Sequence, residues 1–456
     1  DLHTAYRRQR QMCIRDSNII EPDNGIVFDP ACGSAGMFVQ TGHFIEEEGL
    51  NPAEKVTFYG QEKSETNTRL AKMNMTVHGL DASILQGNTF YEDHHDLIGK
   101  CSYVMANPPF NVDGVDKARD IVKNDRRLPF GLPKNDNANY LWIQYFYAYL
   151  NDKGRAGFVM ASSASDAGHT EKNIREELVK TGCVDVMVAI GTKFFYTRGL
   201  PCTIWFFDRT KEEDEKRKDE TLMLDLREVY RKVSSNLHDF SPEHMKNVQA
   251  IVALYRGNSA VLKKVLATYK TEIAAGLKDC KGIWQKLAKA KQLEMPAGKP
   301  EEGQLKALKR SLGAALKAFQ VATKETLKKE AVKKDKVKRK ELQDIQKATE
   351  ALVESFQQAV DHKLYFQKHF EWLQSRFPEG QYTDVPGLCK VVSQTEIAAN
   401  DYSLTPGRYV GVASQIDEDF DYEARMAEIK VELQSLNEEA VSLAAVIMDN
   451  LKEMGI

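Results

Sequence analysis

The sequence predicts an α/β protein in which a doubly wound, mostly parallel, Rossmann-like sheet is followed by a long α-helical C-terminal region. From Asn18 to about residue 235, short and continuously apolar segments alternate with segments of helix length. Strands that are buried on both faces and joined by crossover helices have this pattern. After Ser241 the composition shifts to Lys, Ala, Leu, Glu and Gln, which is typical of long helices.

The elements of the sheet region can be placed in order along the chain. Seven short apolar runs, each ending at turn or polar residues, are expected to be strands. Four longer segments have the length and pattern of helices that connect them. The expected strands are 25–29, 56–62, 83–87, 102–106, 155–161, 184–190 and 203–208, and the expected helices are 35–48, 64–79, 138–151 and 171–181.

A chain of 456 residues is too long for one ordinary core, so we expect several domains. We interpret residues 1–17 as a non-native or scar segment, because they show no strand or helix periodicity. The sheet domain then covers 18–235. A Lys-rich helical insertion or bundle covers 236–385, and 386–456 forms a C-terminal loop and a heptad helix that binds a partner.

Two features of the helical half invite a functional interpretation. The run 328–341 holds eight basic and three acidic residues, so it could contact phosphate, but interspersed acids favour the solvated face of a long helix. The last segment has a narrow apolar seam with 3-4 spacing, which suits a helix of a partner as well as one of this chain. The seam consists of Met426, Ile429, Leu433, Leu436, Ala440, Leu443 and Ile447.

Composition excludes several classes of protein. Hydrophobic residues make up 42% and charged residues 28%, and no apolar run is long enough to cross a bilayer, so we expect no membrane partner. None of the seven cysteines lies in a C-x-x-C pair, which predicts no metal site and favours a reducing cytoplasm. The formal net charge of −3 gives no overall basic excess. A DNA substrate would therefore need a local basic surface or a partner subunit.

The segment from Asp29 to Gly36 is a candidate cofactor site. An acidic residue ends a buried strand, and small residues then form a tight turn that opens a helix. The free N–H groups of a helix N-terminus suit a carboxylate, such as that of S-adenosylmethionine. The spacing is neither G-x-G-x-x-G nor a phosphate loop, although a purely structural corner remains an alternative. The candidate contacts here are Asp29, Ala31, Gly33, Ser34, Ala35 and Gly36.

Two further residues at strand ends complete the predicted cofactor site. Glu62 ends the second strand, where an acid hydrogen-bonds the ribose hydroxyls of a nucleoside cofactor in doubly wound sheets. Asn88 follows the third strand, and its side-chain oxygen could accept a proton of the cofactor's adenine amino group. A solvated glutamate is the alternative for Glu62.

The tetrapeptide Asn107-Pro108-Pro109-Phe110 follows the fourth strand directly and indicates the reaction. The amide oxygen of Asn107 and the carbonyl oxygen of Pro108 can each accept a hydrogen of a planar amino group. Two prolines stiffen the turn, so the backbone cannot rearrange to form hydrogen bonds of its own with these acceptors. Phe110 offers a face on which a flipped base can stack. The sequence therefore predicts methyl transfer to the amino group of an adenine in DNA.

These motifs resemble those of the modification subunit of type I restriction-modification systems, the N6-adenine DNA methylase family. The resemblance rests on VFDPACGSAGMF, FYGQE, NPPF, the segments 128–146, 154–161 and 194–207, and NDYSLTPGRYVG at 400–411. It implies that the residues named above contact cofactor and target base. It also implies two such subunits flanking one DNA-specificity subunit, with the presence of a restriction nuclease subunit left open.

The chain departs from the family pattern in three places. Ala35 stands where the family has glycine, and Asn88 stands where aspartate is common. The helical N-terminal domain and the cofactor-contacting stretch of the family would precede the first strand, so we expect an N-terminally truncated chain. Two alternative functions follow. One is a methyltransferase for RNA guanine N2 or protein glutamine, against which the long helical half argues, and the other is a catalytically impaired scaffold.

Overall fold

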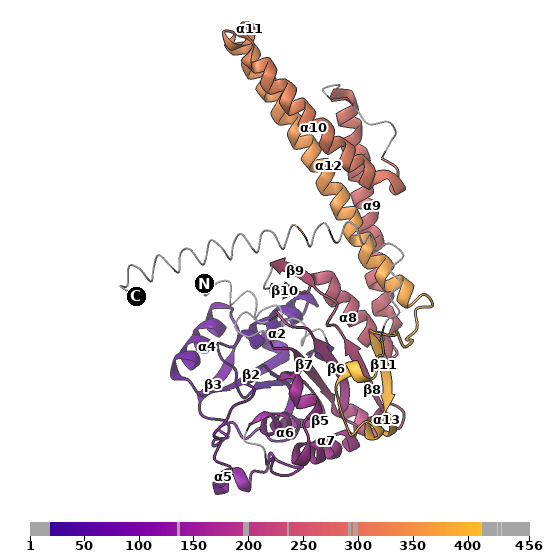
Figure 1. The fold of residues 1–456 in the computed structure, drawn as a ribbon. Helices are drawn as coiled ribbons and strands as arrows, with labels where there is room; N and C mark the ends of the chain where they lie inside the picture. Colours follow the sequence, from indigo (N-terminus) through magenta and orange to yellow (C-terminus); the bar gives the residue numbers. More distant parts are fainter. Residues whose placement is uncertain are drawn as a thin grey trace, which may run out of the picture. The chain divides into compact units, whose positions relative to one another are not determined.

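The computed structural model describes residues 19–134, 137–194, 200–234, 237–290, 293–294 and 300–412, together with Met426 and Lys430 (Figure 1). Residues 1–411 form one compact unit and residues 412–456 a second. The predicted segment 1–17 lies outside the described residues, and of the predicted seam only Met426 is described. Among the described residues, no helix combines the length and the apolar composition that crossing a bilayer requires.

A nine-stranded sheet forms the centre of the first unit, in the order β11-β8-β6-β7-β5-β4-β1-β2-β3. Strands β3, β2, β1, β4 and β5 run parallel, β7 is antiparallel to both of its neighbours, and β11 is antiparallel to β8. The strands are β1 (Gly25–Asp29), β2 (Val56–Glu62), β3 (Ala82–Gln86), β4 (Cys101–Ala106), β5 (Leu150–Ala161), β6 (Val184–Ile190), β7 (Cys202–Asp208), β8 (Glu220–Asp225) and β11 (Cys389–Ser393).

Helices cover both faces of this sheet, as a doubly wound fold requires (Figure 1). Successive residues of a strand point to opposite faces, so Val27 joins one core and Phe28 the other. The first core contains the helices α2 (Gly36–Glu47), α4 (Glu65–Val77) and α8 (Pro242–Tyr255). The second contains α6 (Asn139–Tyr149) and α7 (His169–Thr181). The predicted fold class is therefore confirmed.

The long helices predicted beyond the sheet are also confirmed. The helices α9 (Ser259–Ala290) and α10 (Leu305–Lys328) both pack on α12 (Lys336–Arg376). A separate buried cluster joins them, and it includes Trp284, Leu308 and Phe356. The Lys-rich run 328–341 does not form one face of a single long helix. It includes the short helix α11 (Glu330–Lys333) and the start of α12, which Asp335 caps. Its eight basic residues are exposed.

Sequence reasoning missed four strands. The strand β8 follows a densely charged stretch, and its neighbour β11, at the edge of the sheet, lies in the segment 377–412 that we predicted to be loop-rich. The two strands pair with each other, with Cys389 opposite Leu224. A small antiparallel hairpin, β9 (Arg231–Ser234) with β10 (Leu237–Asp239), follows β8. Short edge strands have weak local patterns because pairing partners far along the chain stabilise them.

Candidate functional site

The carboxyl ends of four parallel strands place the predicted site residues at one edge of the sheet. Asp29 pairs with Gly60, and Glu62 pairs with Gln86, so the ends of β1, β2 and β3 are in register. On the other side of β1, Phe28 pairs with Val104 of β4. The strand order reverses between β1 and β4. Doubly wound sheets bind ligands at such a reversal, outside the carboxyl ends of the strands.

The turn after β1 is tied together by hydrogen bonds to carboxylates. Asp29 is buried, and its Oδ1 accepts a hydrogen bond from the Ala31 amide at 2.9 Å. The pKa of Asp29 is raised to about 8: burial is the main cause, the hydrogen bond from Ala31 lowers it in part, and the negative charge of Glu62 adds to the rise. Asp29 is therefore largely protonated at neutral pH in this state.

Glu62 fixes the glycine turn from the neighbouring strand. Its Oε2 accepts a hydrogen bond from the Gly33 amide at 3.0 Å, and its Oε1 accepts one from the Ser64 amide at 2.8 Å. The Cys32 amide also donates to the carbonyl oxygen of Gln61 at 3.1 Å. An ionised carboxylate has about four acceptor sites, so Glu62 keeps capacity for ligand hydroxyl groups.

Two residues of the turn adopt left-handed backbone conformations. Gly33 has φ 53°, and the space beside its Cα is open. Ala35 has φ 62° and caps α2 without a side-chain hydrogen bond. The left-handed region costs a non-glycine residue roughly 1–2 kcal/mol, which explains a preference for glycine at position 35. The uncapped start of α2 leaves its first amide groups available to an anion.

The segment after β3 is anchored under the turn. Thr89 donates from Oγ1 to the carbonyl oxygen of Pro30 at 2.5 Å, and Gln61 donates from Nε2 to Thr89 Oγ1 at 3.2 Å. Asn88 accepts the Phe90 amide on Oδ1 at 3.2 Å, so this oxygen caps a local turn. Asn88 and Glu62 nevertheless line the same cavity.

The N-P-P-F loop begins at the end of β4, beside β1. Asn107 is half-buried, and its side chain makes no hydrogen bond to any described residue. The carbonyl oxygen of Pro109 accepts a hydrogen bond from Trp142 Nε1 at 3.2 Å. Phe110 is half-buried and packs against both cores of the sheet domain. Asn107 and Pro108 thus keep acceptors without a hydrogen-bond partner within the described structure.

A cavity of about 290 Å³ joins the two motifs. Of the predicted cofactor contacts, Ala31, Glu62 and Asn88 line it, whereas Asp29 and the residues 33–36 are not among its lining residues. Of the N-P-P-F loop, only Pro109 contributes to the lining among the described residues. The remaining lining residues are Pro30, Lys63, Gly87, Thr89, Phe90, Tyr91, Val112, Asp113, Gly114, Val115 and Trp142.

Sequence reasoning missed the aromatic wall of this cavity. Phe90 and Trp142 contact each other with ring centroids 4.6 Å apart. Both lie in segments whose composition indicates ordinary core packing, so only their position beside the strand ends distinguishes them. Trp142 belongs to the segment 128–146 on which the family resemblance partly rests.

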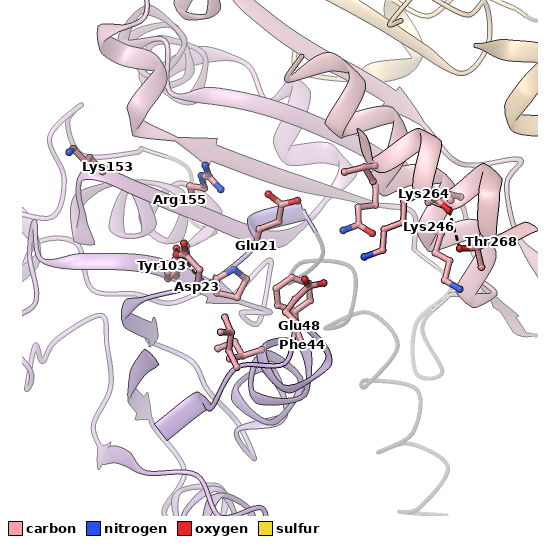
Figure 2. A pocket seen from close by; sticks show the side chains of 16 residues that line it. Glu21, Asp23, Phe44, Glu48, Tyr103, Lys153, Arg155, Lys246, Lys264 and Thr268 are labelled. Carbon is pink, nitrogen blue, oxygen red and sulfur yellow. Dashed lines mark hydrogen bonds between the residues drawn. The ribbon is translucent and has the colours of Figure 1, made fainter. Parts of the chain in front are cut away.

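A second cavity, of about 710 Å³, lies at the other end of the strands (Figure 2). Figure 2 shows Glu21 and Asp23, which precede β1, near Tyr103 of β4 and Arg155 of β5. Tyr103 donates to Asp23 Oδ1 at 2.5 Å. This cavity contains none of the predicted site residues, and it mixes acidic with basic side chains.

Comparison with known proteins identifies the family. A family model described as N-6 DNA Methylase matches residues 13–273 and 317–419. The chain belongs to this family. The match covers both motifs and the returning strand β11, so the resemblance predicted from the sequence is confirmed at the level of family.

Individual relatives of this N-6 DNA methylase chain carry more specific names. The MjaIX methylase subunit, from a type I restriction enzyme of Methanocaldococcus jannaschii, is 35% identical over 236 residues, which are 51% of this chain and 41% of that one. The HindI methylase subunit of Haemophilus influenzae is 34% identical over 235 residues, 50% of this chain and 51% of that one. The chain thus spans about half the length of the curated relatives it matches.

Among solved structures, the methyltransferase subunit of a type I restriction-modification system from Streptococcus thermophilus is 20% identical and has a TM-score of 0.46. The alignment covers 54% of this chain and 51% of that one. The EcoKI M protein is 22% identical with a TM-score of 0.44, over 53% of this chain and 52% of that one.

Proposed function

We propose that this chain transfers a methyl group from S-adenosylmethionine to the N6 amino group of adenine in DNA, as the modification subunit of a type I restriction-modification complex. The observation that carries the proposal is a cavity at the carboxyl ends of β1–β3, where Pro109 of the N-P-P-F loop lines the same space as Glu62 and Asn88. An amino-group acceptor site beside a nucleoside-type site fits a methyl transfer to a base.

The residues present fit the cofactor. The open glycine turn and the uncapped start of α2 would take the methionine carboxylate on free amide groups. Glu62 would accept the ribose hydroxyls, and Asn88 with the Phe90 ring would meet the adenine. When bound, the cofactor supplies an electrophilic methyl group on its sulfonium. Asp29 stays behind the turn, where it positions the Ala31 amide.

The N-P-P-F loop would hold the target amino group. Asn107 Oδ1 accepts one N–H and the carbonyl oxygen of Pro108 accepts the other, which turns the nitrogen lone pair out of the ring plane. The nitrogen would gain the methyl group as the methyl–sulfur bond breaks and S-adenosylhomocysteine leaves, and it would lose one proton to water or through Asn107. Phe110 stacks on the flipped base, which offsets roughly 1–3 kcal/mol of the cost of unstacking it.

A complex of several subunits accounts for the charge of the chain. Its net charge is −3, whereas a protein that grips DNA alone has a basic excess. We infer that two such subunits flank a DNA-specificity subunit, which supplies much of the phosphate contact and the sequence recognition. A restriction nuclease subunit would join them in a complete system. The chain would act in the cytoplasm, where its DNA lies.

Methyl-transfer assays test this function directly. The chain is combined with the specificity subunit of the proposed complex, tritium-labelled S-adenosylmethionine and DNA from a strain without adenine methylation. We expect label in DNA as N6-methyladenine. Label only in RNA or in protein would instead support an enzyme for guanine N2 or glutamine. If calorimetry detects no binding of S-adenosylmethionine, the result would instead support a catalytically impaired scaffold.

A further inference from the structure

Helix α6 holds the N-P-P-F loop through hydrogen bonds that the proposed chemistry does not itself require. Trp142 donates from Nε1 to the carbonyl oxygen of Pro109 at 3.2 Å. One turn earlier on the helix, Asn139 donates from Nδ2 to Oδ1 of Asn111 at 2.8 Å. In return, Asn139 Oδ1 accepts the Asn111 amide at 2.8 Å. The first residue after the tetrapeptide is thus fixed on both its backbone and its side chain.

The conformation that these bonds hold is an uncommon one. Asn111 has φ 55°, in the left-handed region that asparagine tolerates better than most residues. Asn139 is 3% exposed, so loss of its partner would leave a buried amide unsatisfied at a cost of about 1–3 kcal/mol. The two hydrogen bonds between Asn111 and Asn139 therefore fix the direction in which the loop leaves β4, because any other direction would break both of them.

The indole hydrogen bond decides which prolyl carbonyl remains open. Pro109 has its oxygen engaged by Trp142, whereas the carbonyl of Pro108 and the side chain of Asn107 have no hydrogen-bond partner among the described residues. The Trp142 ring is itself fixed, because it packs against Phe90 with centroids 4.6 Å apart. Two neighbouring acceptors are therefore open while the third is occupied.

We propose that Trp142 and Asn139 are positioning residues that aim the acceptors of Asn107 and Pro108 at the target amino group. This inference rests on the proposed function. Both residues act through the loop: they fix its direction, and they need not bind the cofactor. Their loss should therefore slow methyl transfer by more than it weakens cofactor binding.

The first test compares Trp142→Phe with a matched control on the same helix. Trp142→Phe removes the N–H group and keeps an aromatic ring beside Phe90. The control is Tyr145→Phe, because the Tyr145 hydroxyl is buried without a hydrogen-bond partner in the described structure. We expect Trp142→Phe to lower the single-turnover rate about 10-fold, the effect of one hydrogen bond, with a distinctly smaller rise in the Kd for S-adenosylmethionine. The control should keep the wild-type rate.

Three outcomes would overturn the inference. Trp142→Phe could transfer methyl groups at the wild-type rate, it could weaken cofactor binding by as much as it slows transfer, or Tyr145→Phe could slow transfer equally. The last two would indicate a general structural role for the helix. The melting temperature of each variant, measured in parallel, separates a slower reaction from a smaller folded fraction.

A second readout does not depend on activity. Amide hydrogen exchange of Asn111 reports its bond to Asn139, so Asn139→Ala and Trp142→Phe should both accelerate it, and Tyr145→Phe should not. If wild-type protein binds the cofactor but methylates no DNA, the proposed function fails, and exchange still tests the hold of α6 on the loop. Unchanged exchange at Asn111 in both variants would refute that hold.

Discussion

Glu62 Oε2 accepts a hydrogen bond from the amide of Gly33, at 3.0 Å, and so joins the end of β2 to the glycine turn after β1. The second oxygen of the same carboxylate accepts the Ser64 amide at 2.8 Å. One side chain therefore shapes the turn before any ligand arrives. It can also accept ligand hydroxyls, which links the stability of the turn to cofactor affinity.

Replacement of Glu62 should lower both the stability of the protein and its affinity for the cofactor. Glu62→Gln puts an NH₂ group where one of the two amide donors needs an acceptor, so we expect a loss of about 1.5–3 kcal/mol in unfolding free energy. Cofactor Kd should rise 10-fold or more. Urea denaturation and calorimetry measure the two effects. The control is Glu65→Gln, an exposed residue paired with Arg69, which should change stability by less than about 1 kcal/mol. Equal effects of the two substitutions would contradict the assigned role.

Replacement of Asn107 should separate chemistry from cofactor binding. Asn107→Ala removes an acceptor that acts on the reacting nitrogen, and removal of one such group in other enzymes lowers kcat by about 10²–10³-fold. The Kd for S-adenosylmethionine should stay within about twofold, because the helix start and Glu62 are untouched. Asn51→Ala, which removes an exposed cap of the short helix Pro52–Lys55, is the control for any loss of stability. An active Asn107→Ala enzyme would disprove the amino-group mechanism.

The burial of Asp29 predicts how stability depends on pH. Burial raises the pKa of Asp29 to about 8, well above the ordinary value of 3.8 for an aspartate. Between these values the unfolded chain has released the proton that the folded protein keeps, so the unfolding free energy falls as pH rises from about 4 to about 8. Asp29→Asn keeps an acceptor for the Ala31 amide and should flatten that slope. Urea denaturation at several pH values measures it, and an unaltered slope would refute the prediction.

Ala35 provides a test of backbone strain. Its φ of 62° costs roughly 1–2 kcal/mol, but Ala35→Gly also loses a buried methyl group worth about 0.8 kcal/mol and adds freedom to the unfolded chain. We expect these effects to offset each other, leaving stability within about 1 kcal/mol of wild type. Ala35→Val should cost more, because branched residues rarely adopt this conformation. Calorimetric melting of the Ala35→Gly and Ala35→Val variants measures the two effects. An Ala35→Val variant as stable as wild type would contradict the left-handed conformation at this position.

The parts of the fold with strong local patterns could be predicted from the sequence. The strands β1, β2 and β6 were predicted with the bounds that the structure has, because each is a short apolar run between clear turn residues. The strand β8 and the edge strand β11 could not, because they pair with each other across a long stretch of chain. Local composition holds no information about such a pairing.

In the candidate site, too, some relationships could be predicted from the sequence and others could not. The placement of Asp29, Glu62, Asn88 and the N-P-P-F loop at the carboxyl ends of the strands follows from parallel topology, and Glu62, Asn88 and Pro109 line one cavity there. The bond from Trp142 to Pro109 could not be predicted, because the two residues meet only through the packing of α6 on the sheet.

The pairing of β8 with β11 has a consequence for the order of events during protein synthesis. The free edge of β8 is complete once Asp225 has left the ribosome, but its partner strand begins only at Cys389. At roughly 5–20 residues per second, the intervening chain takes on the order of ten seconds to emerge. During that time a nascent sheet carries an unprotected apolar edge, which neighbouring chains on the same messenger could pair with. Chaperone demand during translation should therefore peak before the last strand appears.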